Sequence, residues 1–201
     1  MTNRNSITNR NLANGKLDLW AKVIIAKNMQ ADEPIFGAFD ECCNPVPGTL
    51  NVTLADGETV ECIRNFKIIF NQDSVTEQFI CANKVILSIP FTAYFWIKTN
   101  LGFVNSSMTF TFTKEIPVCR FVKQDGTPLT ACEFREFVEQ SFVVVCDYEI
   151  AYINILPKTT PTIQTIQIIL TATVADKLGK YQDVLVYGDK EDFGCIVDCC
   201  D

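Results

Sequence analysis

Ten cysteines are the most evident source of chemistry in this chain. Two pairs are adjacent in the sequence, Cys42-Cys43 and Cys199-Cys200, and Cys195 precedes the second pair. Because a bond between neighbouring cysteines is strained, each member of a pair needs a partner elsewhere. We therefore interpret these five as candidates for disulfides between subunits. Pairing of the tail with Cys42-Cys43 of the same chain is the alternative.

The other cysteines are isolated and lie in or beside expected strands. Each is either a small buried core residue or a disulfide partner: Cys62, Cys81, Cys119, Cys132 and Cys146. Structural zinc sites commonly use CxxC pairs, whereas this chain offers adjacent cysteines and a spacing of four. We therefore expect no metal and no other cofactor.

Histidine is absent, which removes the usual general base near neutral pH and every Ser-His or Cys-His nucleophile. The nearest candidates for paired carboxylates are Asp40 with Glu41 and Glu133 with Glu136. Acidic residues in loops are mostly just solvated, and the chain has no glycine-rich phosphate loop. The sequence therefore predicts that the protein is not an enzyme and has no catalytic residue.

Charge and hydropathy exclude two classes of partner. The net charge is −7 and no basic run occurs, so we expect no binding to nucleic acid. No apolar run approaches the roughly 18 to 20 residues that cross a bilayer, so we expect no membrane. The first 16 residues lack the apolar region of a signal peptide. We expect synthesis in the cytosol and exposure outside the cell after lysis.

Alternation of apolar and polar residues predicts strands along most of the chain. Met108, Phe110 and Phe112 interleave with serine and threonine, and residues 142–152 and 163–174 alternate in the same way. Further segments rich in β-branched and aromatic residues are 17–26, 49–54, 60–70, 78–82, 84–89, 92–99, 120–122 and 181–187. Only residues 131–140 have the spacing of a short helix.

These segments predict an all-β protein, an antiparallel β-sandwich of jelly-roll type with about nine or ten strands in a single domain. The sandwich spans residues 17–188, between a flexible arm at 1–16 and an acidic, cysteine-rich tail at 189–201. Residues 32–48, which hold Cys42-Cys43, are expected to form a loop. In the tail, Ile196 and Val197 are candidates to add as a strand to a neighbour's sheet edge.

Several of these features resemble a known family. The asparagine-rich arm, the two adjacent cysteine pairs and the β core are similar to the self-assembling proteins of the Bacillus and Clostridium spore surface, in particular the pilin subunits of endospore appendages. The segment VILSIPFTAYFWI at 85–97 also looks like a passage of some clostridial spore-assembly proteins. The resemblance implies a single jelly-roll sandwich with a cysteine-bearing terminal connector. Appendage pilins carry cysteines in the amino-terminal connector, whereas the first cysteine here is residue 42, so we assign the crosslink to the tail.

The leading hypothesis is a structural subunit of a bacterial spore surface that forms a fibre or layer locked by disulfides. Its partners would be copies of itself in a head-to-tail polymer, with a spore-coat or exosporium protein as a possible anchor. A jelly-roll capsid or tail protein of a virion is a second hypothesis. A monomeric sandwich that binds a ligand through its loops is a third.

Overall fold

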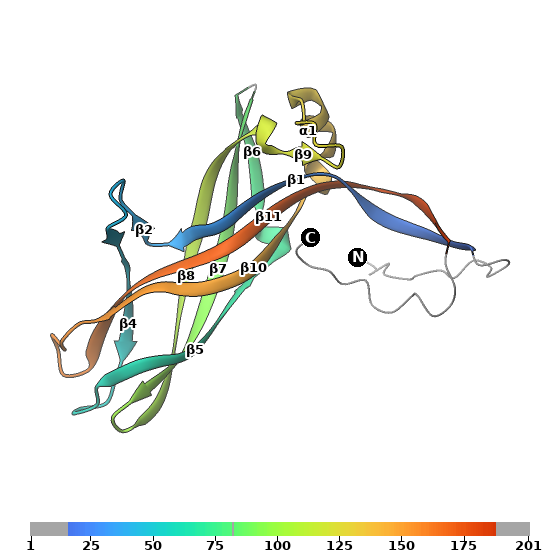
Figure 1. Ribbon diagram of the computed structural model, residues 1–201. Coiled ribbons are helices and arrows are strands. Elements are labelled where there is room, and N and C mark those ends of the chain that lie inside the picture. The colour runs from blue at the N-terminus through green and yellow to red at the C-terminus, as the bar shows by residue number, and fades with distance from the viewer. Residues whose placement is uncertain (1–15, 82, 188–201) are drawn as a thin grey trace.

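The computed structural model describes residues 16–81 and 83–187, and shows an all-β protein built from two principal antiparallel sheets (Figure 1). The first sheet has the order β10-β11-β1-β9, with β4 also paired to β11. Its strands are β1 (Lys16–Phe36), β4 (Gly48–Thr53), β9 (Val122–Lys123), β10 (Phe142–Ile155) and β11 (Ile163–Tyr187).

The second sheet is arranged around β7 (Lys84–Thr99). β8 (Gly102–Pro117) pairs with β7 along its whole length on one flank. The other flank is shared by β5 (Val60–Phe70) and β6 (Thr76–Cys81). Two short strands, β2 (Ala38–Phe39) and β3 (Pro45–Val46), form a small hairpin beside the first sheet.

Four short helical segments connect the strands. The 3-10 turns are η1 (Gln72–Ser74), η2 (Val118–Arg120) and η3 (Val138–Gln140), and the one α-helix of the described chain is α1 (Ala131–Phe137). Thr130 and Glu133 cap α1 reciprocally, each side chain accepting a hydrogen bond from the other's backbone N–H. The capped helix presents Phe134, which packs against Phe121 and Phe79 at one end of the core.

The core lies between the sheets and follows from the two-residue period of the central strands. Every second residue of β7 from Val85 to Ile97 is at most 1% exposed. The facing row of β11 is equally buried: Ile166, Ile168, Leu170, Ala172, Val174 and Leu178. Burying a large apolar side chain contributes about 1.5–3 kcal/mol, so these two rows are the main source of cohesion between the sheets.

The expected all-β antiparallel sandwich is confirmed, and residues 131–140 are helical as predicted. Two pairs of expected strands are single strands. Residues 84–89 and 92–99 are joined through Pro90, which lies where β5 has ended and β6 has not begun, so the missing N–H leaves no ladder bond unmade on that flank. Residues 163–174 and 181–187 are joined in β11 through Gly179.

The expectation of a loop over residues 32–48 was wrong in part. β1 continues to Phe36, β2 and β3 pair within the segment, and β4 already begins at Gly48. Asp32, with φ of +52°, and Pro34 lie at register shifts in the pairing of β1 with β11. Such bulges let a ladder continue past residues that are unfavourable in a regular strand.

Within the described residues, no helix is both long and apolar enough to span a membrane.

Candidate functional site

Cys42 and Cys43 lie in the turn that joins β2 to β3, and both are exposed free thiols. Asp40 organises the turn: its carboxylate accepts hydrogen bonds from the backbone N–H of Cys42, at 2.9 Å, and of Asn44, at 2.7 Å. Its own carbonyl accepts from the N–H of Cys43. With φ of +62°, Cys43 takes a left-handed conformation that the bonds to Asp40 maintain. The two thiols are therefore held at the surface by a defined turn.

The other cysteines with described side chains differ in accessibility. Cys119 in η2 and Cys132 in α1 are exposed free thiols, while Cys62 in β5 is a half-buried one. Cys146, half-buried in β10, is disulfide-bonded, and its partner is outside the described side chains. Cys81 ends β6, and its side chain is likewise outside them.

The remaining candidates lie outside the residues that the structure describes. These are Cys195, Cys199 and Cys200, with the docking residues Ile196 and Val197. The arm at 1–16 is described only at Lys16, which begins β1. The predictions for these residues stay predictions.

One carboxylate of each pair considered as a catalytic candidate has structural partners. Asp40 caps the thiol turn, and hydrogen bonds from Asn44 lower the pKa of its carboxyl. Glu133 accepts hydrogen bonds from Lys123 and from the backbone of Thr130, which lower its pKa to about 2. A carboxylate with a lowered pKa is a poor general base near neutral pH. In the described residues no cluster of three or more His, Cys, Asp or Glu is arranged to hold a metal ion.

β1 and β11 continue together beyond the rest of their sheet. β10 pairs with β11 only as far as Lys177, and β9 pairs with β1 only at Ala26 and Lys27. The β1–β11 pairing runs on to Lys16 and Tyr187. Residues 16–25 and 178–187 thus form a two-stranded ribbon that projects from the sandwich, and no third strand pairs with it among the described residues (Figure 1). We call this segment the ribbon. The side chain of Gln140 accepts a hydrogen bond from the backbone N–H of Tyr181.

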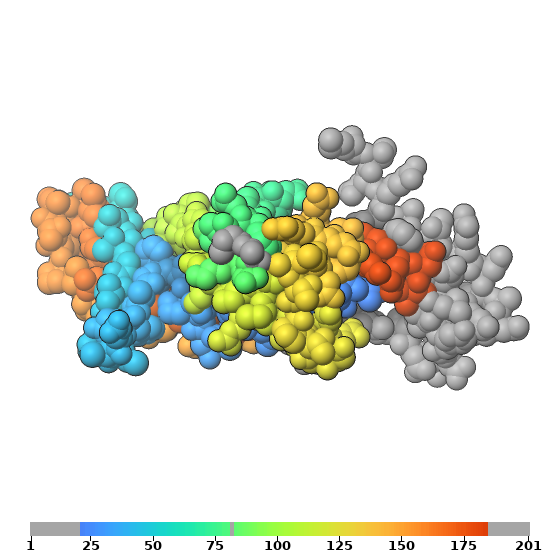
Figure 2. Space-filling view, turned by 90° about the horizontal axis from the view of Figure 1, so that it is seen from above, coloured from blue at the N-terminus to red at the C-terminus, as the bar shows by residue number. Residues whose placement is uncertain are grey.

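The ribbon is not expected to be stable by itself. A two-stranded ribbon alone is marginally stable in water, and an unpaired strand edge is a template for pairing with another chain. Figure 2 shows an elongated molecule in which the coloured part of β11 that is nearest its end lies at one end of the coloured residues, and residues near 40 lie toward the other. The ribbon and the Cys42-Cys43 turn are therefore well separated.

One buried feature escaped sequence reasoning. Asp176 lies in the inward row of β11 between Val174 and Leu178, and it is 1% exposed. Both oxygens of its carboxyl group, and both of Glu77 from the opposite sheet, lack a hydrogen-bond partner among the described residues. Burial raises the pKa of Glu77, and burial together with the charge of Glu77 raises the pKa of Asp176 well above its ordinary range. The sequence did contain a signal: Asp176 occupies a position of β11 at which the two-residue alternation expects an apolar residue.

Comparisons with known proteins identify no relative of this chain. No protein-family model matches it. No curated protein matches it either. No solved structure matches its fold. The residues and their geometry are therefore the basis on which a function can be assigned.

Proposed function

We propose that this chain is a structural subunit that assembles head to tail with copies of itself into a fibre or layer locked by disulfides between subunits. The ribbon carries this proposal, because it is a two-stranded projection to which no third strand is paired in the described chain. A neighbouring subunit that pairs with either edge would bury it. A head-to-tail contact leaves an unused surface at each end of the pair and therefore propagates.

The positions of the thiols support a crosslink between chains. The segment after Tyr187 starts at the tip of the ribbon, and residues 188–200 span at most about 45 Å when fully extended. Cys42 and Cys43 follow the far end of β1, whose 21 residues span about 65–70 Å. Cys199 and Cys200 are thus better placed to reach the Cys42-Cys43 turn of a neighbour than that of their own chain.

The spore surface is part of the proposal on the strength of the family resemblance alone. A chain with no histidine and with ten cysteines fits a permanent extracellular assembly. Synthesis in the cytosol and exposure after lysis would keep the thiols reduced until assembly begins. A spore-coat or exosporium protein would then anchor the polymer.

Electrophoresis without reductant tests the assembly, and we expect a ladder or material too large to enter the gel. A strong thiol reductant should collapse it to a single band near 22.6 kDa. Changing Cys195, Cys199 and Cys200 together to serine should abolish the ladder and leave a folded β monomer. The matched control is Cys62→Ser, which removes a half-buried thiol and should keep the ladder.

Peptide mapping decides which cysteines are joined. We expect at least one bond between a tail cysteine and Cys42 or Cys43 of another copy. Finding all three tail cysteines bonded only within their own chain would refute the covalent assembly. Wild-type protein that stays monomeric at all concentrations under oxidising conditions would refute the proposed function as a whole.

A further inference from the structure

Three lysines gather on one face where the ribbon leaves the sandwich. Lys27 of β1 and Lys177 of β11 are directly opposite each other in the antiparallel pairing. Like charges in directly opposed positions destabilise a sheet. Lys22 lies nearby, with its ammonium 4.6 Å from the ring centre of Phe142, and Phe142 is itself the partner of Lys177 in β10. We call Lys22, Lys27 and Lys177 the lysine face.

The lysine face has no anionic partner in the described chain. The ion pairs of the described residues involve Lys84, Lys98, Lys114 and Lys123. Lys177 is only 9% exposed, and burial lowers the pKa of Lys22. A buried or partly buried charge without a counter-ion costs free energy. The arrangement is therefore incomplete without an anion.

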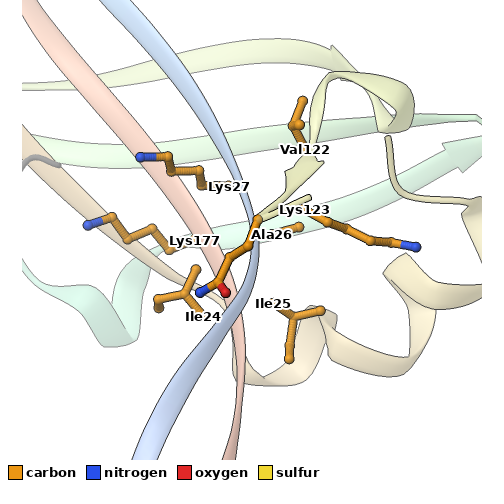
Figure 3. Close-up of a pocket in the computed structure, with 8 residues that line it drawn as sticks. Ile24, Ile25, Ala26, Lys27, Val122, Lys123 and Lys177 are labelled. Carbon is orange, nitrogen blue, oxygen red and sulfur yellow. The ribbon is translucent and has the colours of Figure 1, made fainter. Parts of the chain in front are cut away.

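A cavity of about 210 Å³ is lined by two of these lysines, Lys27 and Lys177. Figure 3 shows Lys27 and Lys177 extending to the same side of the ribbon, close to Ile24, while Lys123 points away. Lys123 is already paired with Glu133. Apolar side chains complete the cavity wall, chiefly Ile24, Ile25 and Val122. A ligand for this site therefore carries carboxylates next to apolar groups.

The chain itself contains a segment of that composition. Residues 188–201 read GDKEDFGCIVDCCD, with five carboxylate side chains and one lysine, and with apolar side chains among them. The ribbon root has the opposite charge: residues 21–27 and 177–182 hold four lysines and no acidic residue. In a chain of net charge −7, this is a marked local excess of positive charge.

We propose that the lysine face and its cavity receive the acidic segment 188–201 of a second copy, which deepens the proposed function and rests on it. Reach favours a second copy. Lys177 lies ten residues, about 33 Å, back along β11 from Tyr187. Asp189, Glu191 and Asp192 are at most about 18 Å of chain from Tyr187, so they fall short of Lys27 and Lys177 of their own chain.

Charge reversal in two separate chains tests this contact. The first variant is Lys22→Glu with Lys27→Glu, and the second is Asp189→Lys, Glu191→Lys and Asp192→Lys. Each alone should associate at least about tenfold more weakly than wild type in thiol reductant, because face and segment then have the same sign. An equimolar mixture should regain association, since each altered surface finds its complement in the other chain.

The readout is sedimentation velocity at low and high salt, with circular dichroism to check the fold of each variant. The control, Arg64→Glu with Lys67→Glu, makes the same change of charge on exposed residues of β5 and should associate like wild type. Restoration only when both sets of changes are in one chain would show a contact within the chain and overturn the proposal.

The two proposals fail separately. If wild type assembles and the lysine-face variant assembles equally well, the docking site is wrong and the self-assembling subunit stands. If wild type itself does not associate at any concentration, the proposed function fails. Weakening of the lysine-face variant without recovery in the mixture would also overturn the segment as the occupant.

Discussion

Asp176 is the single residue whose chemistry is most at odds with its position. Its pKa is raised, so the folded protein holds a proton that the unfolded chain releases just above its ordinary pKa of 3.8. Stability from this group is therefore greatest below that pH and falls as the pH rises through the folded pKa. Asp176→Asn should raise the free energy of unfolding at pH 7 by about 2 kcal/mol and flatten its pH dependence above pH 4.

Urea unfolding from pH 3 to pH 8 measures this effect. Glu133 provides the opposite case: its folded pKa of about 2 lies below the ordinary value of 4.5, so its contribution is present above pH 4.5 and lost as the pH falls toward 2. Glu133→Gln should therefore reduce the loss of stability in acid without relieving the loss at neutral pH. An Asp176→Asn variant that is less stable than wild type at pH 7 would contradict the interpretation of Asp176 and Glu77 as a buried acid pair.

Thiol accessibility is a second property at the residue scale. In freshly reduced protein, Cys42, Cys43, Cys119 and Cys132 are exposed and should react with a maleimide before Cys62, which β5 half-buries. Mass spectrometry of peptides from a labelling time course gives the order. Faster labelling of Cys62 than of Cys42 would show that the turn between β2 and β3 is not presented as described.

At the scale of elements, two glycines permit close approach of strands. A Cβ on Gly179 would lie 2.8 Å from the carbonyl oxygen of Val23 in the ribbon, and one on Gly48 would lie 2.2 Å from the ring of Phe36 in the sandwich. Gly179→Ala should loosen the ribbon locally. Gly48→Ala should lower the global free energy of unfolding by about 1–3 kcal/mol through overpacking.

Hydrogen exchange resolved by residue separates the two effects. Gly179→Ala should speed exchange in residues 16–25 and 178–187 and leave the core of β7 unchanged. Gly48→Ala should speed exchange throughout the sandwich. Equal changes in both variants would mean that the ribbon unfolds together with the sandwich rather than independently of it.

The elements also show which parts of the fold a sequence pattern can predict. Period-two alternation located the core strands because the sandwich buries one face of each. The same pattern wrongly divided β7 at Pro90 and β11 before Gly179. The free-energy cost of a proline or glycine within a strand depends on whether another strand pairs with it on that flank, which the pattern does not show. Asp32 and Pro34 are accommodated in β1 by register shifts in its pairing with β11, which alternation alone does not predict.

At the scale of the whole molecule, the proposed assembly and its proposed crosslinks depend on contacts between chains that composition cannot place. Alternation predicted the sandwich, and cysteine positions predicted candidate bonds. Neither predicted that β1 and β11 extend beyond the strands that flank them, because the length of the ribbon depends on where β9 and β10 end. The sequence likewise did not predict that the carboxyl groups of Asp176 and Glu77 form a buried pair, because the two residues belong to different sheets.

The antiparallel pairing of Lys16 with Tyr187 at the ribbon tip also determines how the molecule bears mechanical load. Tension between the two termini of one chain would open the β1–β11 hydrogen bonds one after another, as a zipper opens. Tension from the end of β11 to the Cys42-Cys43 turn would instead act along both strands and load many hydrogen bonds at once, since these bonds lie perpendicular to the strands. In the proposed assembly, subunits joined from segment 188–201 to that turn would therefore be loaded in their mechanically stronger direction.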